Sequence, residues 1–397
     1  MSSAESRQDF FVQLQQDILD FHRIKPELEL SVRDPDLDVE GYVVVWNLPE
    51  PGGFGKGGTR VTPTVSLDEV GMLARTMSLK NAAAGVPMGG AKSGIRGNPR
   101  GPGFKQQFQA IARRFKPLFP EHGGPFGGMG FDMGARPEFV DWFIEATGMP
   151  QRFTGKPAEL GGTDYDLHGI AGLGVAVAAR AALMAAGGTA EGASFAVQGL
   201  GAMGAGVVRW FSSFGGHARW VSDPLVGGAW ELPDELDPAA RQQIVDAITA
   251  MDRERLHELL REHGKNIGPP QAVLYQDVDV LFPCAVHDVI HKGNVSDVIA
   301  RVVSEGANGP CTADARDALQ DQGAVVLPDF LANSGGIIAA WVEMTEQGGD
   351  KAAEAKRRTE QIIDANVRRV LADATRLDVS PYQSAMSMAL RRVFRRE

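Results

Sequence analysis

The sequence predicts an α/β protein built from two domains. A chain of 397 residues is long enough for two hydrophobic cores of ordinary size. From residue 194 onward, short apolar strands alternate with helical segments, which is the order of a parallel sheet covered by helices. A turn with three glycines, Gly199-Leu-Gly-Ala-Met-Gly204, joins the first of these strands to the first helix.

The composition restricts the class of partner. The formal net charge is −10, with 43% hydrophobic and 23% charged residues, which is typical of a globular protein and disfavours nucleic acid or an anionic membrane as the partner. A small molecule is the expected ligand, and no metal site is expected. The apolar stretch 169–188 contains Arg180 and many small residues, which favours a buried helix over a membrane span.

The cysteines and the N-terminus indicate the compartment. Cys284 and Cys311 are too few for a disulfide framework, and the residues after Met1 lack the apolar core of a signal peptide. A cytoplasmic location is therefore expected.

The first part of the chain shows both helical and extended patterns. Apolar residues at helical spacing predict a helix over 10–24. Residues 41–46 and 59–65 are expected to be extended, with a glycine-rich loop over 49–58 between them.

A helix-start signal follows directly. Ser66, with Glu69 three residues later, has the form of a capping box, so we expect a helix over 67–84. Lys80 would then lie near the end of this helix, and Lys92 in the loop beyond it.

Lys92 is unusual because glycines surround it in Pro87-Met-Gly-Gly-Ala-Lys-Ser-Gly94. Glycines have no side chain, so they suggest that another molecule approaches the backbone there. A crowded amine near a second cation, Lys80, loses proton affinity and can act as a base near neutral pH. The alternative is an exposed lysine in a flexible loop.

The first alternating segment has the order of elements that a dinucleotide-binding fold requires. A strand over 195–198 runs into the turn Gly199–Gly204, a helix over 205–214 follows, and a strand over 217–222 ends at Asp223. The first two glycines allow a tight turn and close approach to a ligand, and the third lets the helix pack on the strand. We therefore predict a Rossmann-type domain whose turn contacts the cofactor through Gly199, Gly201, Ala202, Met203 and Gly204.

A second segment with three glycines at the same spacing serves as a control. Gly53-Phe-Gly-Lys-Gly-Gly58 is followed by an extended segment instead of a helix, so we exclude it as a nucleotide site. Asp223, 24 residues after Gly199, is the candidate for the adenosine ribose hydroxyls, which favours NAD. Ser222 and Arg219 could assist a 2′-phosphate, so NADP is the alternative.

Two further apolar runs, 278–285 and 302–306, are expected to be strands of the same parallel sheet. Ligands bind at the carboxyl ends of such strands, which places Cys284, Ala285 and Asn308 beside the nicotinamide half of the cofactor. Cys284 could be a nucleophile, but a free cysteine that acts as a small hydrophobe is more common, and we expect that role.

Three further segments carry recognisable patterns. Asp132 lies in a second glycine-rich turn, 127–134, where it is either a functional carboxylate or a turn cap. Apolar residues at helical spacing predict a long amphipathic helix over 352–377. The arginines at 391, 392, 395 and 396 are expected to form a solvated helix end.

The segment from Val86 to Pro99 resembles the active-site signature of the glutamate, leucine, phenylalanine and valine dehydrogenases. The resemblance extends to five further blocks in the family's order, which are Lys56–Arg60, Thr154–Pro157, Gly199–Gly204, Ser304–Pro310 and Leu327–Gly336. The matching region covers roughly residues 40 to 345.

This resemblance implies oxidative deamination of an L-amino acid to a 2-oxo acid and ammonia, in a site closed off from water by two domains. It implies that Lys80 binds the substrate α-carboxylate and that Lys92 activates the water that attacks the imine. The Asp132 position would move protons to and from the amino group, while Asn333 and Gly336 would line the pocket.

Side-chain specificity is left open between glutamate and other amino acids. Lys56 matches the family position that binds the distal carboxylate in glutamate enzymes, so L-glutamate is the leading substrate. Ala340 stands where those enzymes commonly carry a serine. The loop with Asp164, Asp166 and His168 also departs from the family pattern and hints at a substrate with a polar or basic group.

A dehydrogenase for another amino acid is therefore the first alternative, and a non-catalytic, cofactor-binding regulatory relative is the second. We expect residues 1–170 with 345–397 to form an α/β substrate-binding and oligomerisation domain, and residues 171–344 to form the NAD(P)-binding domain. Family members form hexamers or octamers, so the resemblance implies a homo-oligomer, and we expect a hexamer.

Overall fold

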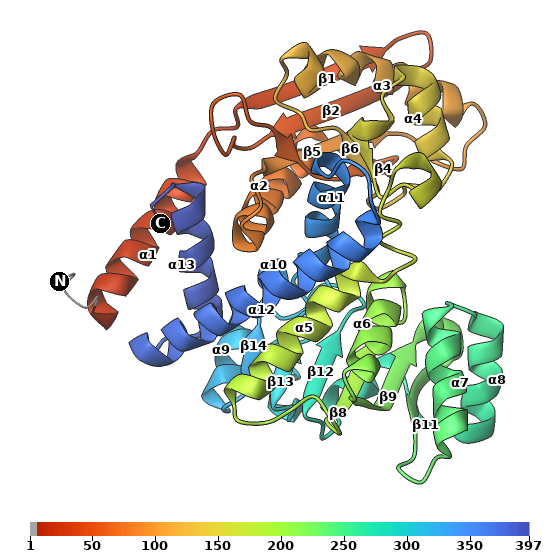
Figure 1. The fold of residues 1–397 in the computed structure, drawn as a ribbon, viewed down its shortest axis with the longest axis vertical. Coiled ribbons are helices and arrows are strands. Elements are labelled where there is room, and N and C mark those ends of the chain that lie inside the picture. Colours follow the sequence, from red (N-terminus) through yellow and green to blue (C-terminus); the bar gives the residue numbers. More distant parts are fainter. Residues whose placement is uncertain (1–5, 397) are drawn as a thin grey trace. The chain divides into compact units, whose positions relative to one another are not determined.

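The computed structural model describes residues 6–396, which form two compact units (Figure 1). The amino-terminal unit contains Phe11–Asp164, Ile337–Ala355 and the chain from Met386 onward. The central unit contains the segment up to Phe10, Tyr165–Gly336 and Lys356–Ala385. Each unit has its own sheet and its own hydrophobic core.

A five-stranded sheet forms the centre of the amino-terminal unit. Its strands are β1 (Leu28–Asp34), β2 (Val39–Val45), β3 (Gly55–Lys56), β4 (Thr59–Thr62) and β5 (Gly89–Arg96). β2 pairs antiparallel with both β1 and β5, whereas β3 and β4 run parallel to β5. β5 therefore has hydrogen-bonded partners on both of its edges. A separate short parallel pair is formed by β6 (Met129–Gly130) and β7 (Phe153–Thr154).

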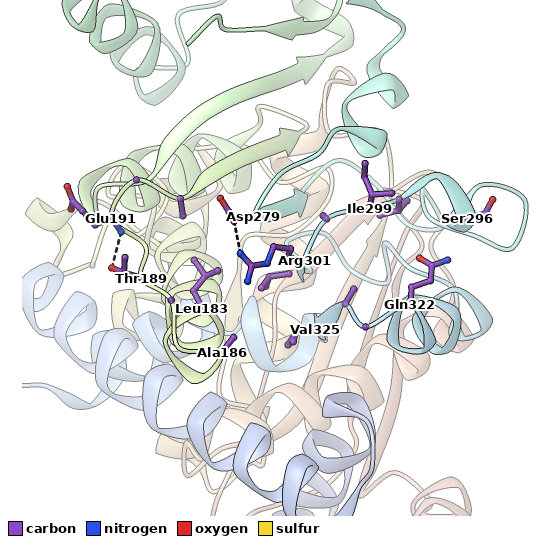
Figure 2. Close-up of a pocket in the computed structure, with 18 residues that line it drawn as sticks. Leu183, Ala186, Thr189, Glu191, Asp279, Ser296, Ile299, Arg301, Gln322 and Val325 are labelled. Atoms are coloured by element: carbon purple, nitrogen blue, oxygen red, sulfur yellow. Dashed lines mark hydrogen bonds and ion pairs between the residues drawn. The ribbon is translucent and has the colours of Figure 1, made fainter. Parts of the chain in front are cut away.

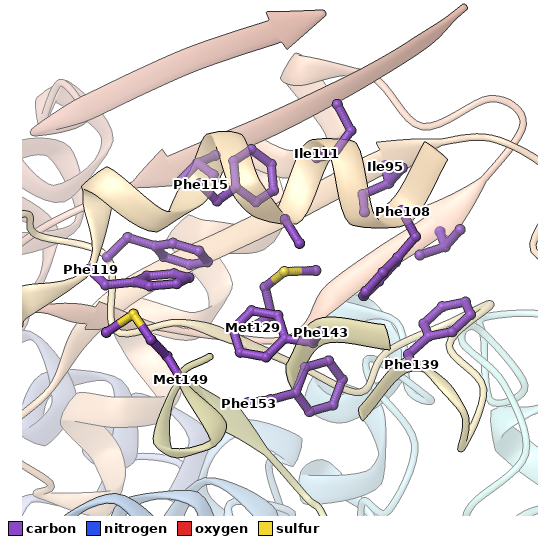
Figure 3. Packing of buried hydrophobic residues seen from close by; sticks show 14 of the residues in the cluster. Ile95, Phe108, Ile111, Phe115, Phe119, Met129, Phe139, Phe143, Met149 and Phe153 are labelled. Carbon is purple, nitrogen blue, oxygen red and sulfur yellow. The ribbon is translucent and has the colours of Figure 1, made fainter. Parts of the chain in front are cut away.

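Helices cover both faces of the five-stranded sheet because successive side chains of a strand point to opposite faces. Val43 of β2 belongs to an aromatic-rich cluster with α3 (Phe104–Phe115) and α4 (Phe139–Thr147), part of which is drawn in Figure 3. Val44, its neighbour, packs with residues of α2 (Leu67–Ala84) on the other face. The sheet is thus the middle layer of three.

The predicted elements of this unit are largely confirmed. The expected helix over 10–24 is α1 (Arg7–Arg23), and the expected strand over 41–46 is β2. The hydroxyl of Ser66 accepts a hydrogen bond from the Glu69 amide at 3.2 Å, which is the predicted cap of α2. The helix ends at Gly85, whose φ of 66° only glycine adopts readily.

The prediction that Lys92 lies in a loop is wrong, because Lys92 is in the middle of β5. The glycines around it serve the chain's own packing. A Cβ atom on Gly90 would lie 2.3 Å from the Ser78 nitrogen and 2.4 Å from the Ala74 oxygen, both in the backbone of α2. One on Gly94 would lie 2.7 Å from a methyl carbon of Val70 in the same helix. Glycine in this strand therefore lets α2 lie against it.

A seven-stranded sheet forms the centre of the central unit, in the order β11-β10-β9-β8-β12-β13-β14. Its strands are β8 (Ser194–Gln198), β9 (His217–Asp223), β10 (Gly228–Glu231), β11 (Lys265–Gly268), β12 (Val280–Pro283), β13 (Val302–Ser304) and β14 (Val325–Leu327). Five of them, β8, β9, β12, β13 and β14, are parallel, which confirms the four predicted strands, and β10 pairs antiparallel with both β9 and β11. The strand order reverses between β8 and β12, where such sheets bind their ligands.

The remaining α-helices lie between Ile170 and Val393. They are α5 (Ile170–Ala185), α6 (Ala202–Ser213), α7 (Pro238–Thr249), α8 (Arg253–His263), α9 (Ala313–Asp321), α10 (Asp329–Ala332), α11 (Gly335–Thr345), α12 (Lys351–Leu377) and α13 (Pro381–Val393). α5 is the predicted buried helix, and α12 is the predicted long amphipathic one. Within residues 6–396, no helix is both long and apolar enough to cross a membrane.

The end of the chain differs from its expected organisation. Segment Lys356–Ala385 belongs to the central unit, where Glu360 of α12 accepts a hydrogen bond from Arg180 of α5 at 2.8 Å. The expectation that all four C-terminal arginines are solvated is wrong for Arg392. Its guanidinium donates to the Ala82 and Ala83 carbonyls at 3.2 and 2.8 Å, because the last carbonyls of α2 have no partner within the helix. The functional assignment of the predicted domains stays a prediction.

Replacing Gly90 by alanine is expected to destabilise the protein by about 1–3 kcal/mol or more, because the added methyl group overlaps backbone atoms of α2. Gly71→Ala in α2 is the matched control, since its Cβ would find nothing within 4 Å. That variant should gain about 0.5–1 kcal/mol from helix propensity. Denaturant unfolding measures both, and equal stability of the two variants would contradict this account of β5.

Candidate active site

Lys92 and Asp132 form the shortest ion pair among the predicted site residues. The Lys92 Nζ lies 2.5 Å from the Asp132 Oδ2. Both side chains are largely buried, at 8% and 18% exposure. Asp132 also accepts a hydrogen bond from the Met133 amide at 2.7 Å, and a guanidinium nitrogen of Arg60 lies 3.5 Å away. Asp132 is thus both a turn cap and the partner of the lysine.

The charge state of Asp132 follows from these neighbours. Burial alone would raise the pKa of its carboxyl group, but Lys92 opposes this by charge and by hydrogen bonding, and Arg60 and the Met133 amide add to it. The net effect is a pKa below the ordinary value for aspartate. An ionised carboxylate is therefore held in contact with a buried amine, an arrangement in which a proton can pass between the two groups.

Lys56 is the buried amine whose pKa is clearly lowered. Only 4% of the residue is exposed, and its Nζ donates to the Gly57 and Met129 carbonyls at 3.0 and 2.9 Å. Burial lowers its pKa to about 7, and Lys92 contributes in the same direction by repulsion. Lys56 lies in β3, directly beside Gly90 of β5, so the strand that carries Lys92 also fixes the position of Lys56.

Asn81 connects the segments that carry the three lysines, a role that the sequence did not reveal. It follows Lys80 in the last turn of α2 and is completely buried. Its amide nitrogen donates to the Gly89 carbonyl at 2.7 Å and to the Lys56 carbonyl at 3.3 Å. One side chain thereby holds the end of α2 against the start of β5 and against β3. Its position beside Lys80 was the only available signal.

Lys156 and Glu343 form a second buried ion pair, also not predicted. Their side chains are 3% and 0% exposed. The Glu343 carboxylate also accepts hydrogen bonds from the Gly155 amide at 3.0 Å and from Thr163, by its amide at 3.2 Å and its hydroxyl at 3.0 Å. Lys156 lies in a block that resembles the family, but nothing near it in the sequence indicates its partner on α11.

In the central unit, the three glycines of the predicted turn have three different surroundings. Gly199 has a φ of 87°, and a Cβ on it would lie 2.7 Å from the Ala285 Cα. A Cβ on Gly204 would lie 1.8 Å from the Gly199 oxygen, so this glycine lets α6 approach the turn. A Cβ on Gly201 would meet nothing within 4 Å. The backbone at Gly201, followed by Ala202 and Met203 in the first turn of α6, is open to a ligand.

Asp223 ends β9 as predicted, and both of its carboxylate oxygens accept backbone hydrogen bonds. Oδ2 accepts from the Leu200 amide and Oδ1 from the Leu225 amide, each at 2.9 Å. The first bond ties the acid to the glycine turn. Each oxygen keeps a second lone pair, so the carboxylate can still accept a hydroxyl.

Cys284 lies beside the glycine turn, at the carboxyl end of β12. Its amide donates to the Gln198 carbonyl at 2.8 Å. Ala285, the next residue, and Asn308, in the loop after β13, are both exposed. Although Cys284 is half-buried as a residue, burial of its thiol raises its pKa well above the ordinary value. This favours the predicted role of a small hydrophobe over that of a nucleophile.

Comparison with known sequences decides the family. Residues 161–397 match the family described as Glutamate/Leucine/Phenylalanine/Valine dehydrogenase, and residues 26–149 match the Glu/Leu/Phe/Val dehydrogenase dimerisation domain. The chain belongs to this family. It is an NAD(P)-dependent amino acid dehydrogenase, and the match to a dimerisation domain supports an oligomer.

Individual relatives agree over most of their length. The chain is 37% identical over 344 residues to the NADP(+)-dependent glutamate dehydrogenase of Pyrobaculum calidifontis, covering 84% of this chain and 79% of the relative. It is 31% identical over 348 residues to the NAD-specific glutamate dehydrogenase A of Halobacterium salinarum, covering 85% and 77%. The hetero-hexameric glutamate dehydrogenase of Thermus thermophilus, solved in a leucine-bound form, superposes with a TM-score of 0.76 at 25% identity, covering 100% and 97%.

Asn333 of this dehydrogenase organises the loop after β13. Its amide nitrogen donates to the Gly306 carbonyl at 3.1 Å and to the Asn308 side-chain oxygen at 3.2 Å. Below the loop, buried Glu305 accepts from Arg316 at 3.2 Å and from the Asp329 amide at 2.9 Å, and burial raises its pKa to about 7. These contacts fix the backbone that carries Asn308.

The other predicted pocket residues lie on α11 and in the departing loop. Gly336 is half-buried in the central unit, and Ala340 is buried in the amino-terminal unit. Asp164 has a left-handed backbone with a φ of 47°, and its amide donates to the Lys156 carbonyl at 3.2 Å. The His168 carbonyl accepts from the Trp210 indole at 3.1 Å.

An open cavity of about 770 Å³ lies at the amino-terminal ends of strands of the central sheet (Figure 2). It is lined near the starts of β8, β13 and β14, away from the carboxyl ends where the glycine turn lies. Its guanidinium, Arg301, is paired with Asp279 at 3.2 Å. By strand direction this cavity is not the cofactor site. Among residues 6–396, no group of three or more His, Cys, Asp or Glu side chains is placed to hold a metal ion.

Both thiols are expected to react slowly with iodoacetamide at pH 8 in the native enzyme. Burial raises the pKa of Cys284 and Cys311, so the thiolate fraction falls about tenfold for each unit of increase. Mass spectrometry of the alkylated peptides should show at least about tenfold slower labelling than after unfolding in urea. Rapid native labelling of Cys284 would instead support a nucleophilic thiol.

Proposed function

We propose that this enzyme oxidatively deaminates L-glutamate to 2-oxoglutarate and ammonia. The observation that carries the proposal is Lys56, a buried cation that has no carboxylate within 4.0 Å among residues 6–396. Its neighbouring cations are all paired, Lys92 with Asp132, Lys156 with Glu343 and Arg152 with Glu121. Burying an uncompensated charge costs several kcal/mol, and the distal carboxylate of glutamate would relieve that cost.

The roles of the other residues follow from the same chemistry. Lys80 would bind the α-carboxylate, and Asp132 would accept a proton from the substrate ammonium group. Loss of hydride from Cα to the nicotinamide, which is the chemistry that the cofactor supplies, leaves a carbon–nitrogen double bond. Lys92 would then take a proton from the water that attacks this imine, and ammonia leaves. The contact between Lys92 and Asp132 supports this proton path.

NAD is the proposed cofactor, held by the turn Gly199–Gly204 with Asp223 at the ribose. A 2′-phosphate would need a cation, and Arg219 is already within reach of Glu231 and Asp234. Ser222 is completely buried. Relatives of both cofactor types exist, so NADP is the alternative. Asn308, Cys284, Ala285, Asn333 and Gly336 are proposed to face the nicotinamide half and the substrate.

We propose that the enzyme is a homo-hexamer, supported by the dimerisation-domain match and by the likeness to a relative that is a hetero-hexamer. A cytoplasmic location is supported by two free cysteines.

A dehydrogenase for a different L-amino acid is the second candidate. Ala340 favours it, because the glutamate enzymes that the sequence resembles commonly have a serine there. Losing one hydrogen bond to a carboxylate weakens binding by about 1.5–3 kcal/mol, which is not enough to outweigh the charge of Lys56. The presence of Lys80, Lys92 and Asp132 disfavours a non-catalytic relative.

A panel of L-amino acids assayed with NAD and with NADP tests the substrate. We expect kcat/KM for glutamate to exceed that for L-norvaline, which carries a methyl group in place of the distal carboxylate, by about 10- to 150-fold. In Lys56→Met this ratio should approach one. The glutamate proposal fails if the wild-type enzyme oxidises an aliphatic amino acid and not glutamate.

Lys92→Ala is expected to lower kcat by about 10²–10⁴-fold while leaving NADH binding, measured by fluorescence, unchanged. Lys105→Ala is the matched control, because Lys105 is a partly exposed lysine of α3 paired with Glu145 at 2.8 Å. Substantial turnover by the Lys92 variant would sink the proposed proton path.

A further inference from the structure

Arg253 of α8 hydrogen-bonds to the glycine turn that is proposed to hold the cofactor. Its Nη2 donates to the Leu200 carbonyl at 2.5 Å, and Leu200 stands between the first two glycines of the turn Gly199–Gly204. Asp252 caps α8 by accepting a hydrogen bond from the Arg255 amide at 3.0 Å, which fixes the backbone from which the Arg253 side chain extends. A cation is thus held in contact with the backbone of the turn.

Leu200 is held by groups of opposite charge. Its carbonyl accepts from Arg253, and its amide donates to the Asp223 Oδ2 at 2.9 Å. A carboxylate can accept hydrogen bonds from the hydroxyls of a ribose, whereas a guanidinium can donate to phosphate oxygens. The acid and the cation beside Leu200 therefore suit adjoining parts of one dinucleotide. Gly201, the next residue, leaves open space for a ligand, because a Cβ there would meet nothing within 4 Å.

Most donors of the Arg253 guanidinium have no acceptor in the protein. A guanidinium carries five N–H donors. Nη1 is buried without a hydrogen-bond partner, and among residues 6–396 no carboxylate forms an ion pair with Arg253. Because a donor without an acceptor is unfavourable in a protein interior, this cation can gain from an incoming anion. The residue as a whole is partly exposed, so a ligand can approach its side chain.

The neighbouring arginines of the central unit are engaged elsewhere. Arg219 lies within reach of two acids, and Arg241 donates to two backbone carbonyls. Arg255, two residues further along α8, forms an ion pair with Glu258 at 3.2 Å. Arg253 therefore differs from these three in having no acidic partner and in touching the glycine turn.

We propose that Arg253 is a cofactor-binding residue whose guanidinium donates hydrogen bonds to a phosphate group of the dinucleotide. This inference rests on the proposed cofactor site at the turn Gly199–Gly204, and it is independent of which amino acid the enzyme oxidises. The phosphate is either the pyrophosphate, which NAD and NADP share, or the 2′-phosphate, which only NADP carries. The bond to Leu200 keeps the guanidinium beside the start of α6, where the backbone amides of a helix also favour phosphate.

The test is Arg253→Met, which removes the charge and the donors but keeps an unbranched side chain. Binding of NADH and NADPH is measured by fluorescence, and binding of adenosine, 5′-ADP and 2′-AMP by competition with NADH. We expect the dissociation constant of one phosphorylated fragment to rise about 10- to 150-fold, because charge-assisted hydrogen bonds are lost. Adenosine has no phosphate, so its dissociation constant should change less than about threefold.

The two phosphate groups give different results. If the contact is to the pyrophosphate, 5′-ADP, NADH and NADPH all bind more weakly to Arg253→Met. If the contact is to the 2′-phosphate, 2′-AMP and NADPH bind more weakly while 5′-ADP and NADH do not. In both cases kcat at saturating cofactor should change less than about threefold, because a phosphate contact is made equally in the ground state and the transition state.

Two further variants separate a phosphate contact from a structural role. Arg255→Met is the matched control, because Arg255 is an exposed arginine of the same helix, and it should leave every dissociation constant unchanged. Arg253→Lys keeps the charge and a donor for the Leu200 carbonyl but loses the planar fork, so it should lose less affinity than Arg253→Met. The lysine variant serves as the test if the methionine variant does not fold.

Gly201→Ala tests the proposed cofactor site independently. The φ of Gly201 is −68°, which alanine also adopts, and the added methyl group would occupy the open space beside the turn. If this variant and Arg253→Met both bind all the ligands as the wild type does, the proposed cofactor site fails and the inference fails with it. If only Gly201→Ala binds NADH more weakly, the cofactor site stands and the role of Arg253 is overturned. Equal loss of affinity for adenosine and for the phosphorylated fragments in Arg253→Met would also overturn it.

Discussion

The close approach of helix α2 to strand β5 is the constraint on which the amino-terminal unit depends. Gly90 allows it, because any side chain there would overlap the backbone at Ala74 and Ser78. Lys80 lies near the end of the helix and Lys92 lies in the strand, so the contact holds together the two elements that carry these lysines. Asn81 then ties the helix end to Gly89 and Lys56 through two carbonyls. Packing of the backbone thus determines where the segments that carry the lysines lie.

Ion pairing determines which of the buried lysines remains available to bind an anion. Lys92 and Lys156 each have a carboxylate in contact, and such pairs contribute little to stability but are costly to break. Lys56 has only carbonyl partners, the Gly57 and Met129 oxygens, and no carboxylate contacts its amine among residues 6–396. An amine in that state can still receive an anion.

Local signals in the sequence were enough for the cap at Ser66, the helix it begins, and the parallel sheet with its glycine turn. The predicted loop at Lys92 is wrong because β5, with three glycines and Ile95 as its one β-branched residue, lacks the composition by which strands are recognised. Its strand character comes from pairing with β2, β3 and β4, which only the tertiary fold reveals. Lys156 and Glu343 are 187 residues apart, so no spacing could connect them.

The segments Gly53–Gly58 and Gly199–Gly204 have glycines at the same spacing, and they show why a glycine pattern alone does not identify a nucleotide site. In Gly53–Gly58, a Cβ on Gly57 would lie 1.9 Å from the Ala91 oxygen, and one on Gly55 would lie 2.8 Å from the Gly90 oxygen. Those glycines let β3 and the turn after it pack on β5, so the space beside Gly55 and Gly57 is filled by the backbone of β5. In the second match, Gly201 faces open space at the start of a helix, where backbone amides can meet a phosphate. Open space beside a glycine, more than the spacing of the glycines, therefore distinguishes a turn that can bind a ligand from a turn that packs against the protein itself.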